Sequence, residues 1–134
     1  MGPIARICAA LAALALLAWW PAEGRALEGT GVVLQGLNKV TARVSEFSAE
    51  IGVPVTFGTL EITARACHKK APEEAPESSA FLEVREKQKG EPVKLLFSGW
   101  MFASTPGLSA LQHPVYDVWV LDCAMPGENS DSNG

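Results

Sequence analysis

Apolar and polar residues alternate along two stretches of this chain. In residues 60–66, leucine, isoleucine and two alanines alternate with glutamate, threonine and arginine, and residues 40–45 show the same alternation. A period of two residues is typical of a β-strand with one buried face, whereas an amphipathic helix repeats about every 3.6 residues. The alternation therefore predicts a mainly β protein.

Turn residues divide the rest of the chain into further short segments. Gly52, Pro54 and Gly58 punctuate one connection, and the sequence QKGEP at residues 88–92 predicts a turn. We expect strands over residues 40–45, 53–57, 60–66, 81–87, 93–103 and 115–123. Five to seven short strands without a long helix predict a small antiparallel sandwich or a partly open barrel.

Two connections have a character of their own. Residues 71–80 contain two prolines and three glutamates, which predicts an extended, solvated, acidic loop. Thr105 followed by Pro106 is typical of a helix start, with threonine as the N-cap and proline at the first helical position. We expect one short helical turn from there to Leu111.

The amino-terminal residues resemble a secretory signal. Residues 7–20 are apolar and uncharged, and they are too short to cross a bilayer core, which needs roughly 20 apolar residues. Small residues at Gly24 and Ala26 predict cleavage before Leu27, with the bond after Gly24 as second choice. The alternative is an uncleaved membrane anchor, with Trp19 and Trp20 at the membrane interface.

These features predict three parts and an exported protein. Residues 1–26 are the expected signal peptide, residues 27–123 a single domain, and residues 124–134 a disordered tail of small and polar residues. The whole chain has a formal net charge of −4. An acidic chain is a poor match for nucleic acid or anionic lipid, because both select basic surfaces.

Cleavage leaves two cysteines, Cys67 and Cys123. In an oxidising compartment an even pair in a small domain predicts a disulfide bond. The alternative is a redox-active or metal-binding pair. Redox pairs of the thioredoxin type lie two residues apart at a helix start, whereas these cysteines lie far apart on strand-like segments.

Five stretches, in this order, resemble one bacterial family. They are LNKVTA (37–42), FGTLEI (57–62), RACHK (65–69), FSGWMFAS (97–104) and HPVYDVWVLDC (113–123). The chain is identified by them as a member of domain of unknown function 2155. The resemblance implies an exported, periplasmic, β-rich protein without an assigned activity, and both cysteines fall inside the shared stretches. It also implies a partner at the inner membrane, because members tend to be encoded near an accessory subunit of respiratory complex I.

Side chains of the metal-ligand type are few. Cys67, His68, His113 and Cys123 would suit zinc or copper, but the cysteines cannot be ligands while they form a disulfide. His68 precedes two lysines, which disfavour a cation, and His113 precedes a proline, where a histidine commonly orders the turn. We therefore expect no metal site and no cofactor.

No catalytic group stands out either. Ser98 lacks the glycine and the following helix of a nucleophile elbow, so a triad of Ser98, His113 and Asp117 is a weak hypothesis. The glutamates of residues 71–80 lie in a loop, whereas catalytic acids need rigid, partly buried positions. We expect Asp117 and Asp122 to form ion pairs with basic residues of neighbouring strands, such as Arg65 or Lys39. We also expect that the protein is not an enzyme.

The most informative segment is apolar on both of its faces. Alternation places Leu95, Phe97 and Met101 on one face of the strand at residues 93–103, and Leu96, Trp100 and Phe102 on the other. Each sheet of a small sandwich has only one covered face. The second face therefore needs a cover, which is either a loop or helical turn, such as residues 108–111, or another protein.

The leading hypothesis is a non-enzymatic periplasmic interaction or accessory protein. Its partner would be a protein of an inner-membrane complex such as respiratory complex I, and Leu96, Trp100 and Phe102 would bind it. The alternative is a periplasmic small-ligand or metal-binding module, which a ligand-sized pocket lined by these aromatic residues would favour.

Overall fold

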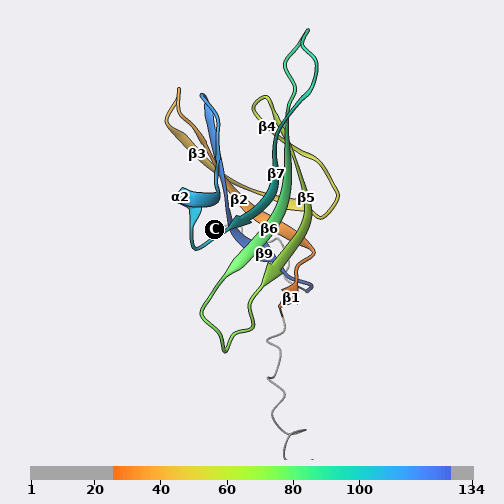
Figure 1. The fold of residues 1–134 in the computed structure, drawn as a ribbon, viewed down its shortest axis with the longest axis vertical. Helices are drawn as coiled ribbons and strands as arrows, with labels where there is room; N and C mark the ends of the chain where they lie inside the picture. Colours follow the sequence, from red (N-terminus) through yellow and green to blue (C-terminus); the bar gives the residue numbers. More distant parts are fainter. Residues whose placement is uncertain (1–25, 128–134) are drawn as a thin grey trace, which may run out of the picture.

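The computed structural model describes residues 26–127, and these residues form two antiparallel sheets that do not close into a barrel (Figure 1). One sheet has the strand order β1-β5-β6-β7, with β4 also paired to β5, and the other has the order β3-β2-β9-β8. The elements are β1 (Leu27–Glu28), β2 (Gly31–Asn38), β3 (Arg43–Glu50), β4 (Val55–Phe57), β5 (Leu60–Lys69), β6 (Ser78–Glu86), β7 (Lys94–Phe102), α2 (Pro106–Ser109), β8 (Leu111–Gln112) and β9 (Tyr116–Ala124).

The core lies between the two sheets. Strand β6 shows how the sequence builds it, because every second residue from Ser78 to Glu86 is buried. Such alternation places one set of side chains on the inner face and the other in water. The largest fully buried side chains come from both sheets and include Val32, Leu34, Leu60, Ile62, Leu82, Val84, Met101, Val118 and Val120. The predicted fold class, an antiparallel sandwich with one short helical turn and one disulfide, is confirmed.

Two β-bulges aim the cysteines into this core. The register of β5 shifts between Ala64 and Ala66, so that Cys67 faces inward although it is out of step with Ala64. The register of β2 with β9 shifts next to Leu34, and Cys123 faces inward in the same way. A bulge inserts one extra residue and thereby changes which face the following side chains occupy. The prediction that Ala66 shares the buried face of β5 is therefore wrong.

The Cys67–Cys123 disulfide joins β5 of one sheet to β9 of the other, with a Cα–Cα distance of 5.7 Å. Both residues are almost fully buried. The predicted bond is confirmed, and while it is formed neither sulfur can serve as a metal ligand.

The first hairpin differs from the expectation. Residues 40–42 form a turn rather than a strand, because the Asn38 side chain accepts hydrogen bonds from the backbone of Val40 and Thr41 at 3.0 and 3.2 Å. Ala42 follows with a φ of 56°, which lies in the left-handed region and outside the extended conformation of a strand. The strand predicted for residues 40–45 instead begins at Arg43. Its partner β2, which carries Val32 and Leu34 into the core, was not predicted at all.

The other connections are close to those expected. The acidic loop is shorter than predicted, since β6 begins at Ser78. The helical turn α2 has its N-cap at Thr105 and a proline at its start, although the threonine side chain makes no capping hydrogen bond. Within residues 26–127 no helix is long and apolar enough to cross a membrane. The predicted signal peptide, apart from Ala26, and residues 128–134 of the predicted tail lie outside the described residues.

Candidate functional site

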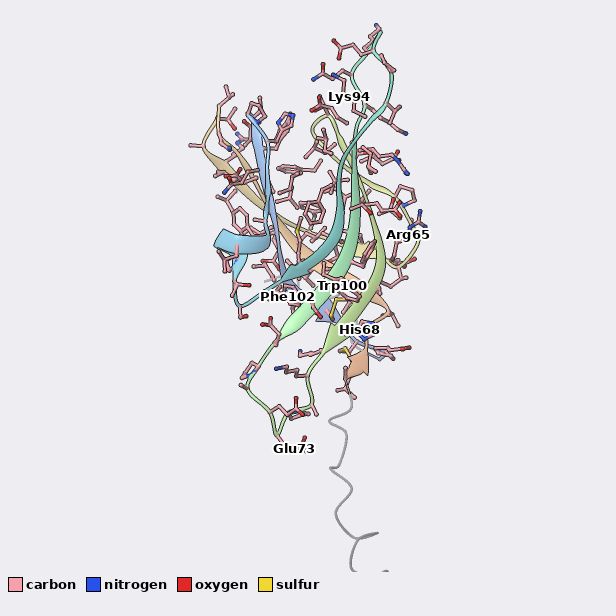
Figure 2. The ribbon with its side chains drawn as sticks, in the orientation of Figure 1. Arg65, His68, Glu73, Lys94, Trp100 and Phe102 are labelled. Carbon is pink, nitrogen blue, oxygen red and sulfur yellow. A yellow bond between two sulfur atoms is a disulfide. The ribbon has the colours of Figure 1, made fainter. Side chains whose placement is uncertain are left out.

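An aromatic face covers part of the outer side of the β5-β6-β7 sheet (Figure 2). We define it by Phe81, Leu96, Trp100 and Phe102 together with His68. Leu96, Trp100 and Phe102 are 36%, 42% and 41% exposed. The antiparallel register places Trp100 directly opposite Phe81. The structure thus brings the three residues predicted to bind a partner onto one face.

Neighbouring rings hold Trp100 in place. The Phe81 ring meets it edge-on, with centroids 5.6 Å apart and an interplanar angle of 84°. The His68 ring lies 5.5 Å away at 64°, also edge-on. Aromatic pairs prefer this geometry, which adds about 0.5–1.5 kcal/mol per pair. The two rings therefore fix the orientation of the indole, and His68 belongs to the aromatic face.

Residues 108–111 do not cover the aromatic face. Leu108 is 90% exposed, and Leu111 is 6% exposed because it packs into the core between the sheets. Leu95 also departs from its predicted face. The register shifts between Val84 and Arg85, which leaves Leu95 opposite Arg85 and 57% exposed.

Charged side chains border the aromatic face on β5 and β6. Arg65 donates a hydrogen bond to Glu83 at 3.2 Å, and Arg85 lies 3.7 Å from the same carboxylate. The hydrogen bond from Arg65 is the main reason that the pKa of Glu83 lies below its usual value. An aromatic centre with a charged rim is the ordinary anatomy of a protein–protein interface.

The predicted ion pairs are partly right. Asp117 pairs with Lys39 at 2.9 Å, as expected. Asp122 does not pair with Arg65, which binds Glu83 instead, but with Lys69 at 3.2 Å. Partial burial raises the pKa of Asp122, but hydrogen bonds from the Cys123 amide and the Ser78 hydroxyl, together with Lys69, outweigh it, so that this pKa is lowered overall.

Lys69, Ser78 and Asp122 also line a hollow of about 520 Å³ beside the β5–β6 loop. Its apolar walls include Leu27 and Leu121, and none of the residues of the aromatic face lines it. Asp122 is bonded to Lys69, Ser78 and the Cys123 amide. The aromatic lining that would favour a small-ligand module is therefore not found there.

His113 lies in a different place from His68. Its Nδ1 accepts a hydrogen bond from the Val115 amide at 3.0 Å, which assigns the proton to Nε2, and Nε2 donates to the Glu86 carboxylate. The side chains of His113 and Glu86 are only 12% and 11% exposed. Glu86 ends β6 and His113 precedes β9, so the pair ties the two sheets together.

The residues of the hypothetical metal and catalytic sites do not come together. Cys67 and Cys123 are bonded to each other, and His68 and His113 contact different partners. Among residues 26–127, no group of three histidine, cysteine, aspartate or glutamate side chains has a geometry that could hold a metal ion. Ser98 lies opposite Glu83, next to the buried Leu82 and Val84 in β6, and thus on the outer face of the sheet. His113 bonds to Glu86 on the inner face.

Comparison with known proteins settles the family. A family model described as an uncharacterised protein conserved in bacteria (DUF2155) matches residues 32–123, which run from β2 to the second cysteine. The chain belongs to the DUF2155 family. A relative in Rickettsia prowazekii (strain Madrid E), described as an uncharacterised protein, is 32% identical over 87 residues, which is 65% of this chain and 56% of the relative. The matched region thus spans about half the length of that relative. No solved structure matches the chain.

For this DUF2155 chain we predict that His113→Ala lowers stability without removing a chemical activity. The change leaves the Glu86 carboxylate nearly buried with one partner fewer, and an unsatisfied buried polar group costs about 1–3 kcal/mol. Chemical denaturation of the two proteins measures the difference. His68→Ala is the matched control, and it should cost less because the His68 ring packs against the Trp100 ring, which is itself partly exposed. Stoichiometric zinc or copper in the wild-type protein, lost in either variant, would contradict the structural role.

Proposed function

We propose that this DUF2155 chain is an exported, non-enzymatic interaction protein that docks onto an inner-membrane protein complex through its aromatic face. The observation that carries the proposal is the exposure of Leu96, Trp100 and Phe102 on one side of a sheet whose other side is the core. Aromatic residues dominate the binding energy of protein interfaces, where they form a central patch surrounded by polar groups. The border of Arg65, Glu83 and Arg85 fits that arrangement.

Two features support export to the periplasm. The apolar residues 7–20 followed by Gly24 and Ala26 have the order of a signal peptide. The Cys67–Cys123 bond belongs to the kind of cross-link that persists in oxidising compartments and is rare in the cytosol.

Export predicts a defined mature terminus. The protein isolated from its own cells should begin at Leu27, or at Arg25 if the second-choice bond is cut. Intact-mass spectrometry of the periplasmic fraction measures this directly. A protein recovered only from membranes with residues 1–26 still attached would instead support the anchor.

If the aromatic face docks onto a partner, Trp100→Ala should weaken binding of that partner while the protein still folds. Because Trp100 is 42% exposed and makes two ring contacts, the variant should lose about 1–3 kcal/mol of its free energy of unfolding, less than the ~3–5 kcal/mol of a core tryptophan. Its recovery with the inner-membrane complex should fall strongly, since truncation of an interface anchor costs ~2 kcal/mol or more. The measurement pairs thermal melting with co-purification from solubilised inner membranes, and complex I subunits are the named candidates.

Leu108→Ala provides the matched control. Leu108 is 90% exposed on α2 and is not one of the defining residues of the aromatic face. This variant should keep both its stability and its partner. The docking proposal fails if Trp100→Ala loses the ~3–5 kcal/mol of a core tryptophan, or if the complex is recovered with it as well as with Leu108→Ala.

A further inference from the structure

Charge is separated between the two ends of the sandwich, and Figure 2 shows Lys94 and Glu73 at these opposite ends. The Lys94 end has two hairpin tips (Figure 1), the β2–β3 tip at residues 39–44 and the β6–β7 tip at residues 87–95. Together the tips carry five basic side chains and one acidic side chain. The β5–β6 loop at the other end, residues 70–77, carries three glutamates and one lysine. The net charge of −4, from which a poor match to anionic lipid is expected, averages over both ends.

A series of contacts shows that the two tips leave the sandwich at the same end. Lys39 donates a hydrogen bond from Nζ to the His113 carbonyl at 2.6 Å. The His113 ring in turn donates to the Glu86 carboxylate. Lys94 lies directly opposite Glu86 in the register of β6 with β7. Tips that belong to two different sheets are therefore neighbours, and one flat surface can contact both.

Three of the basic side chains on the tips are unpaired. The other two form ion pairs with acids of the strands behind the tips. Arg43, Lys89 and Lys94 are exposed, and none of them forms an ion pair with a residue in the described range 26–127. These three cations therefore have no protein partner to give up when they approach a negative surface.

Exposed aliphatic side chains accompany the cations. Val40, Val44, Val93 and Leu95 are each more than half exposed. One exposed valine is ordinary, but hairpin tips are usually built from glycine, proline, asparagine, aspartate or serine. Basic side chains beside aliphatic ones are the combination with which peripheral segments lie in the interface of an anionic bilayer.

We propose that this end of the sandwich binds the surface of a bilayer that contains anionic lipids. Arg43, Lys89 and Lys94 lie beside the headgroups, and the four aliphatic side chains of the tips enter the interface. The acidic β5–β6 loop orients the molecule, because a negative surface repels it. A bilayer is favoured over an acidic protein, because neither tip has an aromatic residue, whereas protein interfaces are centred on aromatic anchors.

The proposal goes beyond the docking proposal, because it uses the hairpin tips rather than the aromatic face. The tips lie at the strand ends of the β5-β6-β7 sheet, whereas the aromatic face is a side of that sheet. A molecule that stands on a bilayer by its tips therefore turns its aromatic face sideways. In this orientation the aromatic face is open to a partner in the same membrane.

Vesicle binding tests the proposal with the chain that begins at Leu27. Residues 7–20 are left out because their apolar run would bind any bilayer, and the core and the disulfide lie within residues 26–127. At low salt the protein should sediment with vesicles of equal parts phosphatidylglycerol and phosphatidylcholine, but not with phosphatidylcholine alone. Salt at about 1 M, where the Debye length is ~3 Å, should release most of the bound protein.

Substitutions on the tips measure the contribution of each tip. A basic residue at an anionic surface is worth about fivefold in affinity, so Lys89→Gln combined with Lys94→Gln should weaken vesicle binding about 25-fold. Arg43→Gln alone should weaken it about fivefold, because both tips contact the bilayer. The matched control is Arg65→Gln combined with Lys70→Gln, which removes as much charge from outside the tips. It should bind nearly as well as the wild-type protein.

The outcomes separate the two surfaces. A protein that binds neither kind of vesicle, or both equally, overturns the proposal. So does an equal loss in the Lys89/Lys94 variant and in the control, which would show an effect of net charge alone. In detergent no bilayer remains, so the Lys89/Lys94 variant should still be recovered with the inner-membrane complex, while Trp100→Ala should still bind vesicles. Loss of the solubilised complex from the Lys89/Lys94 variant would overturn the proposal and assign the tips to a protein partner.

Discussion

Replacing Cys67 and Cys123 together with alanine should lower the free energy of unfolding by about 4 kcal/mol, which is the chain-entropy value for a loop of this length. The bond joins residues separated by 56 positions and connects the two sheets through the core. For a domain of this size such a loss lowers Tm by roughly 15–30 °C. Differential scanning calorimetry of the wild-type protein and the double variant measures it.

Reduction of the wild-type protein is the matched control, since it removes the bond without changing the sequence. Each single variant should lose nearly as much as the double variant, because either change removes the cross-link. Two thiols that react with an alkylating reagent before any reductant is added, together with unchanged melts, would contradict the structural bond.

The strands that sequence reasoning found are those whose alternation follows one sheet face. In β6 the alternation is unbroken from Ser78 to Glu86, and the predicted strand lies almost entirely within it. The predicted strands at residues 93–103 and 115–123 differ from β7 and β9 by one residue at each end. A period of two predicts these elements because burial on one face imposes it.

The errors arise where one residue changes the local geometry. The Asn38 side chain stabilises a turn by accepting hydrogen bonds from the following backbone amides. The alternation of apolar and polar residues at positions 40–43 is therefore coincidental. The bulges before Cys67 and Cys123 reverse the face of each cysteine, and no periodic pattern reports a bulge. The signal missed for β2 was its apolar run at residues 32–34, which indicates a strand buried by a partner that had not been placed.

The candidate site was predicted in part. The positions of Leu96, Trp100 and Phe102 followed from alternation alone. The supporting rings of Phe81 and His68 depend on the register between three strands, which the sequence does not report.

Among the glycine-to-alanine substitutions, each of which adds one methyl group, Gly58→Ala should lower the stability of the protein most. Gly58 and Thr59 connect β4 to β5, and Gly58 has a φ of 58°, the left-handed region that favours glycine at the first central position of a type II′ hairpin turn. A Cβ on Gly58 would lie 2.3 Å from the Cζ and Oη atoms of Tyr116. The Tyr116 ring also meets the Phe57 ring edge-on at 5.3 Å and stacks on His113 at 5.5 Å, so it cannot move without disturbing both.

Backbone strain and the clash with Tyr116 therefore both lower the stability of Gly58→Ala. A substitution at a second glycine measures the strain alone. Gly90→Ala is the control, because Gly90 has a φ of 83° but no atom within 4 Å of the added Cβ. It should cost only the backbone strain, about 1 kcal/mol. Gly58→Ala should lose a further ~1–3 kcal/mol from overpacking against Tyr116. Urea denaturation of both variants measures the difference, and the second change Tyr116→Ala should make Gly58→Ala cost no more than Gly90→Ala. Equal losses in the two glycine variants would show that Tyr116 yields freely, and the row of rings from Phe57 to His113 would then not be rigid.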